Sequence, residues 1–499
     1  MAVMHSWMPV LVLFTSLLAA PVIFLLSEEQ HRVRTAVNLG AAVIKLVLVC
    51  VMIAGIYLGI SYEMRFPVVK GVDFILRADA LGVLFAGLSS LLWLLTTIYA
   101  IGYLEGSPNR SRFFGFFSLC VTSTLGIAYA GNLFTFILFY ELLTLSTYPL
   151  VVHRGTQKAL AAGRRYLQYT LSGGVLLVAG AVMLHAVAGE LSFGDWRYLE
   201  GIAAGKEPWL TAVFFLLIAG LGVKAAMVPL HGWLPSAMVA PAPVSALLHA
   251  VAVVKAGAFG IVRVVYDVYG MSLSFSMGLL DVLAVMSCIT IVYGSARALS
   301  QTEIKRRLAF STVSQVSYIM LGVSIFHPLG AVAGLAHLVH QGLMKITLFF
   351  CAGNYAETLG IHFVGELGGT GRRMPITSIA FTAAAFGMIG VPPAVGFISK
   401  WYLGTGAAGA AMYWVIPVLA ASSVLNAAYF LPLVYRIWFG ARDEEWPHEQ
   451  DIGRLETSAA LLWPPVATAV FSVGAGLLAG LPFSPVFWAT RIAYEVYLP

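Results

Sequence analysis

Long apolar runs recur along this chain and are separated by short polar stretches. A helix needs about 20 apolar residues to cross about 30 Å of hydrocarbon. Residues 64–79 alternate weakly instead, which predicts an external hairpin or strand pair. No stretch is polar and long enough for a soluble domain, so we predict an all-α polytopic membrane protein. The runs predict about fourteen membrane-spanning helices, at 8–26, 36–60, 79–104, 112–130, 133–152, 164–188, 209–229, 244–268, 273–297, 306–326, 330–357, 375–408, 412–440 and 458–481.

Two of these helices are expected to be interrupted. The seventh runs into two prolines within residues 228–235, and the twelfth contains two adjacent prolines within residues 390–397. Proline removes a backbone donor and glycine loosens the chain, so each helix should break there. Broken backbone at membrane depth is tolerated only where it is buried in protein or lines a wet cavity.

The two interruptions lie five helices apart, which is typical of an internal repeat in transporters. We therefore predict two inverted five-helix repeats, formed by helices four to eight and nine to thirteen. The expected organisation is three N-terminal helices in 1–110, a first repeat in 111–270, a second repeat in 271–440 and a last helix in 441–499.

The composition supports a lipid-facing surface. The chain is 60% hydrophobic and 10% charged, with a mean hydropathy of +0.87, whereas a soluble domain is typically about 25% charged. The net charge of +6 comes from basic residues in short loops, so no nucleic-acid partner is expected. All four cysteines, Cys50, Cys120, Cys288 and Cys351, fall in apolar runs without a CxxC spacing, and no disulfide framework, metal site or cofactor is predicted.

The loops also predict an orientation, because cytoplasmic loops carry an excess of Lys and Arg. The loops opposite the termini hold Arg32, Arg34, Arg110, Arg112, Arg154, Lys158, Arg164, Arg165, Arg297, Lys305, Arg306, Arg307, Arg372, Arg373, Arg436, Arg442 and Arg454. The termini side holds only Arg65, Lys70, Arg77, Arg197, Lys206 and Arg491. Both termini are therefore expected on the outer side of the cell membrane.

Ionisable residues inside the helices are the candidate chemistry. They are Lys45, Glu141, Lys224, Lys255, Arg263, Asp281, Lys345, Glu357 and Lys400. A charge at the bilayer centre costs at least about 2.5–3.5 kcal/mol, so such a set is kept only if it pairs, lines water or does work. Static ion pairs or snorkelling explain Lys45, Arg263, Asp281 and Glu357 more simply. Glu141, Lys224, Lys255 and Lys400 are different, because three lysines against one glutamate leave uncompensated charge.

These four residues predict a proton relay, because a buried lysine can shed its proton and histidine titrates near neutral pH. His337 and His340 are three residues apart and share a face of one helix. In this hypothesis the Glu141–Lys224 pair controls Lys255, which passes its proton through His337 or His340 to Lys400. His249 and Lys345 are secondary candidates. A pair 4 Å apart is worth roughly 4 kcal/mol at an effective dielectric of 20, which is enough to gate a proton.

Several segments resemble a known family. Residues 140–150 resemble the glutamate-bearing fifth helix of the antiporter-like subunits of respiratory complex I and of multisubunit Na+/H+ (Mrp) antiporters. Residues 231–257, 304–315 and 390–401 continue the resemblance, which runs from about residue 75 to 440.

The resemblance implies that Glu141 and Lys224 are the gating ion pair, Lys255 the central proton carrier and Lys400 the terminal lysine. A lysine at 400, where a complex I relative carries an acid, is more similar to the D-type chain of Mrp antiporters. Two positions depart from the family pattern: Gln315 stands where many relatives carry histidine, and Gln341 takes the middle position of His-x-x-x-His-x-x-x-Lys.

The favoured function is a proton-translocating subunit of a cation/proton antiporter, with other membrane subunits, the bilayer, protons and sodium ions as partners. The alternative is a proton-pumping subunit of a complex I-like dehydrogenase or membrane-bound hydrogenase. A stand-alone transporter of an organic solute would need a polar midplane pocket, whereas the sequence indicates a line of charges. No nucleotide loop, metal motif or nucleophile–base pair is present, so catalysis by this chain alone is not expected.

Overall fold

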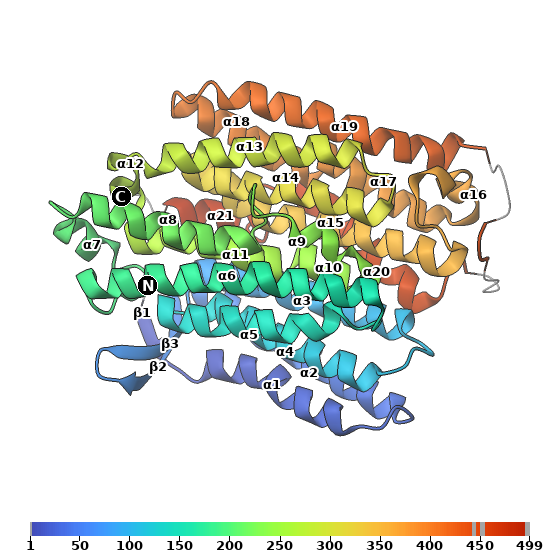
Figure 1. Ribbon diagram of the computed structural model, residues 1–499, viewed down its shortest axis with the longest axis horizontal. Helices are drawn as coiled ribbons and strands as arrows, with labels where there is room; N and C mark the ends of the chain where they lie inside the picture. The colour runs from blue at the N-terminus through green and yellow to red at the C-terminus, as the bar shows by residue number, and fades with distance from the viewer. Residues whose placement is uncertain (1, 442–445, 450–454, 495–499) are drawn as a thin grey trace.

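The computed structural model describes residues 2–441, 446–449 and 455–494, so Arg442 and Arg454 lie outside the described residues. Helices run side by side along the longest axis of the molecule (Figure 1). Twelve helices in the described part of the chain are long and apolar enough to cross a membrane. They are α1 (Met8–Leu25), α2 (His31–Tyr57), α3 (Ala80–Tyr103), α4 (Arg110–Tyr129), α5 (Leu133–Val151), α6 (Gln157–Ala188), α8 (Glu207–Lys224), the helix over Ala242–Tyr269, α13 (Leu279–Leu299), α15 (Pro328–Leu359), α19 (Val415–Phe439) and α20 (Ala459–Leu477). The predicted all-α membrane protein is confirmed.

The two other predicted helices have different forms. The tenth is α14 (Ile304–Ser324), whose first turn carries three consecutive basic residues, and the twelfth is split into α17 (Pro375–Ile389) and α18 (Val395–Gly409). The count of fourteen spans and the two repeats therefore stay predictions. The remaining short helices are α7 (Trp196–Ile202), α9 (Trp233–Ser236), η1 (Ala237–Val239), α12 (Met271–Ser276), η3 (Val364–Leu367), α16 (Thr370–Arg373) and α21 (Pro485–Ile492).

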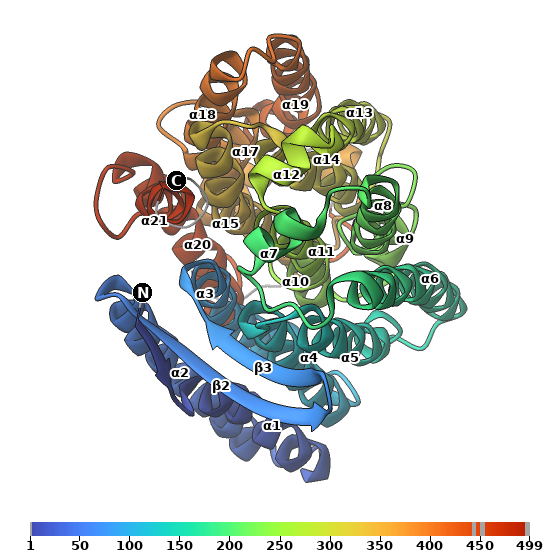
Figure 2. The same cartoon turned by 90° about the vertical axis from the view of Figure 1, so that its left-hand side faces the viewer.

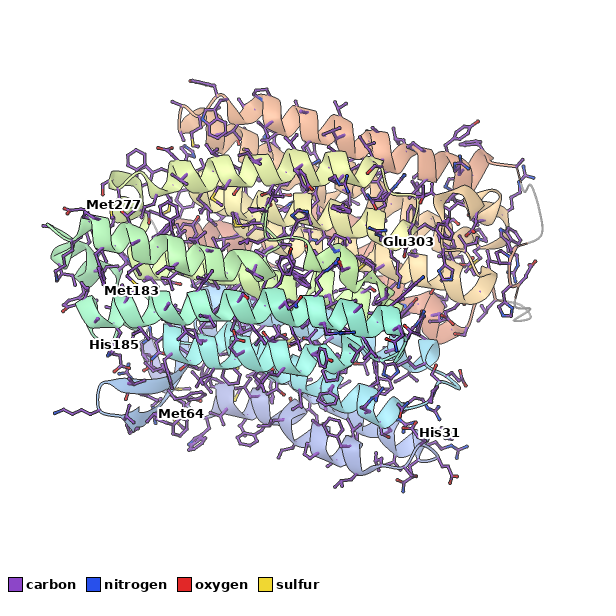
Figure 3. All side chains as sticks on the ribbon, in the orientation of Figure 1. His31, Met64, Met183, His185, Met277 and Glu303 are labelled. Carbon is purple, nitrogen blue, oxygen red and sulfur yellow. The ribbon has the colours of Figure 1, made fainter. Side chains whose placement is uncertain are left out.

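A small sheet lies at the end of the bundle that also holds α21 (Figures 1 and 2). Strands β2 (Ile60–Val69) and β3 (Val72–Ala78) pair antiparallel, which confirms the predicted hairpin. Strand β1 (Ala2–His5), which the sequence pattern did not reveal, pairs parallel with β2. Figure 3 shows Met64 and His185 at this end and Glu303 at the opposite end. The first and last described elements therefore lie at the same end of the bundle.

Both predicted interruptions are confirmed. Helix α8 ends at Lys224 and the next helix begins at Trp233, while α17 ends at Ile389 and α18 begins at Val395. A third interruption was not predicted. The eighth helix is divided at residues 251–252 into α10 (Ala242–Ala250) and α11 (Val253–Arg263), and α11 continues into the π-helix η2 (Val264–Tyr269).

Two helices form the centre of the bundle. The spanning windows of α15 and of the segment Ala242–Tyr269 are completely buried within the chain. Helix α15 packs against α10, α14, α17, α18 and α20, and Figure 2 shows it enclosed by its neighbours. These central helices carry Lys255, His337, His340 and Lys345, so protein rather than lipid surrounds these polar groups.

Candidate functional site

Lys224 lies at the last residue of α8, where the seventh helix breaks, and is 1% exposed. Its ammonium donates a hydrogen bond to the main-chain carbonyl of Tyr140 on α5, and its Nζ lies 3.3 Å from the centre of the Tyr140 ring. Helix α11 approaches closely here, because a Cβ at Gly257 would lie 2.3 Å from the amide nitrogen of Ala225. The glycine therefore lets the backbone beside Lys255 contact the end of α8.

Glu141 is half-buried on α5, and its Oε1 atom is buried without a hydrogen-bond partner in the described part of the chain. None of the ion pairs between described residues includes it. Its carboxylate packs on α6, where a Cβ at Gly174 would lie 2.4 Å from Oε1. The charge of Glu141 acts on Lys224 without direct contact. The hypothesised ion pair between Glu141 and Lys224 is therefore not formed in this structure.

Lys255 on α11 reaches α15 next to His337. Lys255 is fully buried, and its Nζ donates to the main-chain oxygen of Leu338 at 2.7 Å. His337 immediately precedes Leu338 in α15. Its Nδ1 forms a 2.8 Å hydrogen bond with Oγ of Ser399 on α18. The ring centre of His337 also lies 5.2 Å from that of Tyr318. Adjacent residues of α15 thus contact the central lysine and the residue that precedes Lys400.

Lys400 lies at the break of the twelfth helix, one residue after Ser399. Its Nζ donates to the carbonyl oxygens of Met388 and Ile389 at 3.1 and 2.7 Å, and to Ser423 Oγ at 3.1 Å. The two carbonyls belong to the last turn of α17, where the helix dipole favours a cation. The ring centre of Tyr318 lies 5.6 Å from Nζ. The ring of Tyr318 therefore lies near both His337 and Lys400.

Lys345 and His249 form a side branch. Lys345 is fully buried on α15 and its Nζ donates to Ser311 Oγ of α14 at 2.5 Å. The ring centre of His249 lies 4.6 Å from that of Phe349. We use "buried charge line" below for Glu141, Lys224, Lys255, His337, His340, Lys345 and Lys400.

Buried polar atoms without protein partners gather beside this line. In the part of the chain that the structure describes, they include both ring nitrogens of His249 and of His340, Nε2 of His337, both amide atoms of Gln315 and Oε1 of Gln341. Leaving such an atom unsatisfied costs about 1–3 kcal/mol. A polar site of this kind is where proteins hold internal water.

The comparison with known proteins begins with a family model. The model described as NADH:quinone oxidoreductase/Mrp antiporter, TM, matches residues 130–426, more than half of the chain. The chain belongs to this family. The predicted family is thereby confirmed, and the matched range contains every residue of the buried charge line.

Members of the family take part in different assemblies. NADH-quinone oxidoreductase subunit N of Desulforudis audaxviator (strain MP104C) is 34% identical over 430 residues, which cover 83% of this chain and 84% of the relative. Na(+)/H(+) antiporter subunit A1 of Staphylococcus haemolyticus (strain JCSC1435) is 31% identical over 445 residues, 82% of this chain but 53% of that longer relative. A chain of the Mrp complex from Dietzia sp. DQ12-45-1b has the same fold, with a TM-score of 0.85, 23% identity and coverage of 98% and 97%.

Some ionisable residues inside helices stand apart from the line. Arg263 forms ion pairs of 2.6 Å with Asp79 and 2.7 Å with Asp267, and Lys45 donates to Ser16 Oγ of α1. From the sequence, static pairing or snorkelling explained Arg263 and Lys45, and the static contacts seen here agree with that explanation. They tie α11 to the start of α3 and α2 to α1.

The serines that bind the line, Ser311, Ser399 and Ser423, were not singled out from the sequence. The sequence offered one indication of these sites, a hydroxyl inside an apolar span, but this is a weak predictor of a contact with another helix. Most serines and threonines in these helices donate to their own helix, as Ser287 does to the carbonyl of Leu283. Ser311 and Ser399 do so too, so only the packing of neighbouring helices reveals their contacts with the line.

Gly390 positions the terminal lysine, and its replacement gives a first prediction. Its φ is +95°, and a Cβ there would lie 2.9 Å from Cδ of Lys400. Gly390→Ala should therefore strain the backbone and displace the ammonium from Met388 and Ile389. In the hypothesised relay, this should lower the rate of proton translocation roughly tenfold. Gly404→Ala in α18 is the control, because its nearest atom would be 4.0 Å away. Equal rates in the two variants, at equal membrane abundance, would contradict this role for Gly390.

Proposed function

We propose that this chain translocates protons along the buried charge line as a subunit of a multisubunit cation/proton antiporter. One observation carries the proposal. Orphaned polar atoms of His340, Gln315 and Gln341 lie in the same buried region as Lys255, His337 and Lys400. Water that satisfies these atoms also provides hydrogen bonds along which protons move between the lysines.

The proposed order begins at Lys255, whose ammonium lies at the carbonyl next to His337. His337 receives the proton through this hydrated region and passes it by way of Ser399 to Lys400. The charges of Lys255 and Lys400 both act on His337, so a proton on one lysine changes the energy of a proton on the histidine. Lys224 controls the first step, because the end of α8 packs directly on α11.

The antiporter assignment rests on two points. Lys400 provides a terminal base of the kind that the resemblance attributes to the D-type chain of Mrp antiporters. Several relatives, including the Staphylococcus protein, are named as antiporter subunits. The proposed partners are further membrane subunits of such a complex, and sodium is the proposed exchanged ion.

A second candidate is a proton-pumping subunit of a redox-driven complex. It is favoured by the relative from Desulforudis audaxviator, which this chain matches over 84% of its length, whereas it matches 53% of the Staphylococcus antiporter protein. Both candidates use the same buried charge line and differ in what drives the protons.

The experiment that tests these functions uses everted membrane vesicles containing the chain in its native assembly. A pH gradient is first imposed by an unrelated proton pump and followed with a fluorescent amine. If the chain acts in an antiporter, adding about 10 mM NaCl should collapse the gradient, whereas choline chloride should not. If the gradient responds only to an electron donor for the assembly and never to a cation, the antiporter assignment fails and the redox candidate stands.

A further inference from the structure

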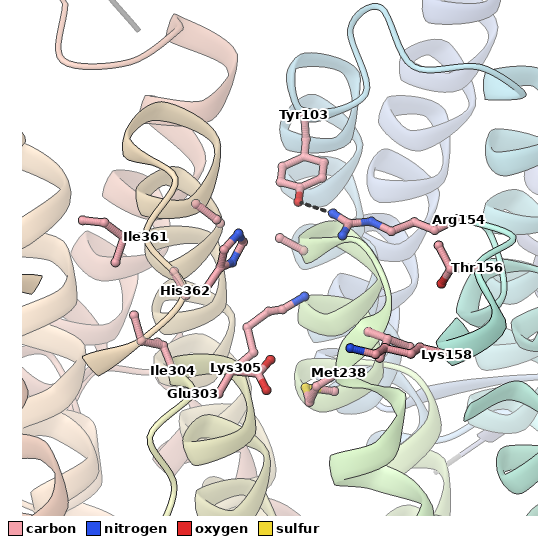
Figure 4. A pocket seen from close by; sticks show the side chains of 15 residues that line it. Tyr103, Arg154, Thr156, Lys158, Met238, Glu303, Ile304, Lys305, Ile361 and His362 are labelled. Carbon is pink, nitrogen blue, oxygen red and sulfur yellow. Dashed lines mark hydrogen bonds between the residues drawn. The ribbon is translucent and has the colours of Figure 1, made fainter. Parts of the chain in front are cut away.

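A basic cavity lies at the end of the bundle opposite the sheet. It has a volume of about 210 Å³ and is lined by Arg154, Lys158, Glu303, Lys305 and His362, among others. Figure 4 shows Lys158 and Lys305 directed toward its interior from different elements, and the guanidinium of Arg154 beside Tyr103. Arg154 Nη2 donates to the Tyr103 hydroxyl at a long 3.5 Å. The cavity therefore opens among cations from the loop before α6, from the first turn of α6 and from the start of α14.

A second cavity of about 590 Å³ adjoins the first. It shares Lys158, Glu303 and His362 with it and adds Arg165 and Arg306. With neutral histidine, five cations and one carboxylate give the two cavities a net charge of +4. The ion pairs of the described residues include none of these five cations. Glu357 on α15, which acts on Lys305, offsets one of these charges, so the region keeps a net positive charge within the described part of the chain.

The hydrogen bonds that Arg154, Arg165 and Lys305 donate go to neutral groups. Lys305 donates to the main-chain oxygen of Ala240 at 2.7 Å, and Arg165 donates to Ser236 Oγ at 2.9 Å. His153, beside Arg154, does not add a charge, because burial and the nearby charges of Arg112 and Arg154 lower its pKa to about 4. A site of net positive charge repels protons and sodium ions, so it is a poor entrance for cations. The same field attracts an anion with several acceptor oxygens.

We propose that this basic cavity binds the phosphate group of an anionic phospholipid. The cavity combines basic side chains with apolar walls from Met238, Val239 and Ile361, which suits an amphiphile better than a free anion. Its loops also belong to the side for which the Lys and Arg distribution predicts the cytoplasm, where the membrane surface is anionic. Basic pockets between membrane helices on that side are suited to lipid headgroups.

The site has a link to the buried charge line. Lys305 acts electrostatically on His249, which lies deeper in α10. Ala352 and Gly353 line the cavity two turns from Lys345 on α15. A bound phosphate would offset the positive charge at this end of the line, so lipid occupancy would alter the field in which protons enter the central helices.

The test measures lipid binding by the purified native assembly in detergent, using fluorescent phosphatidylglycerol and phosphatidylcholine. Each basic residue near an anionic headgroup contributes about 1 kcal/mol, so Arg154→Gln with Lys158→Gln should raise the Kd for phosphatidylglycerol about 30-fold. Binding of phosphatidylcholine should be weak and unchanged. The matched control is Arg197→Gln with Lys206→Gln, two exposed residues at the opposite end of the bundle, which should leave the Kd unchanged.

Two results would overturn the proposal. One is an unchanged Kd in the Arg154/Lys158 variant. The other is competition by inorganic phosphate at the same concentration as phosphatidylglycerol, which would identify a site for free anions. The single variant Arg165→Gln, expected to raise the Kd about fivefold, tests the site independently in case the double variant misfolds. Size-exclusion profiles of all variants establish that the assembly is intact.

Discussion

Replacing Lys255 by methionine is expected to reduce proton translocation at least about a hundredfold while leaving the protein in the membrane. Methionine fills a similar space in the fully buried site next to Leu338, but it carries no proton. Positioned proton-transfer groups contribute about 10²–10⁴ to rates, so removing one that every proton must pass gives a loss of this size. The measurement is the initial rate of pH change in vesicles, normalised to the amount of protein.

The chain offers a matched control for this variant. Lys45 is also a buried lysine, 1% exposed, and its ammonium donates to Ser16 in the N-terminal helices, away from the buried charge line. Lys45→Met removes the same chemical group at similar burial and should leave translocation within about twofold. If both lysine variants lose translocation equally, the loss reflects damage to the bundle and the relay is wrong.

Glu141→Gln should produce the second large effect, again a loss of at least about a hundredfold. Glutamine keeps the shape that packs against Gly174, so the helices should still fit, but it removes the negative charge that acts on Lys224. Without this charge, Lys224 loses the carboxylate that acts on it among the described residues. Glu141→Asp, which retains the charge, should recover part of the rate.

Glu357→Gln on α15 is the control for the loss of a carboxylate. Glu357 lies near the end of its helix and interacts with Tyr103, not with the buried charge line. Its replacement should leave the initial rate nearly unchanged. Normal translocation by Glu141→Gln would show that the charge at position 141 is dispensable and would remove it from the proposed mechanism.

Local sequence signals predicted the helices well because lipid imposes a simple requirement. Runs of about 20 apolar residues identified the spans, and the paired prolines near 229 and 392 identified two breaks. The hairpin over 64–79 followed from alternation. Each of these features depends on residues adjacent in the chain.

Features set by packing between distant segments were missed. The break at residues 251–252 contains neither proline nor glycine, so nothing in the local pattern indicates it. Strand β1 is four residues long and forms only because β2 lies beside it. The separation of Glu141 from Lys224 depends on how α5 and α8 are rotated against each other. The spacing of residues in the sequence does not determine that rotation. The sequence could therefore indicate that both residues belong to the site, but not whether they are in contact.

The breaks have a mechanical consequence. A continuous helix resists bending because every turn is tied to the next by hydrogen bonds, whereas Pro392 and Pro393, between α17 and α18, have no N–H to donate to this ladder. The two half-helices are therefore not held by one continuous ladder, although Gly396 packs closely on the carbonyl of Gly387 across the joint. Lys400 sits on one half and its carbonyl partners on the other. In the proposed relay, a change in the charge of this one side chain would therefore act as a force across the joint.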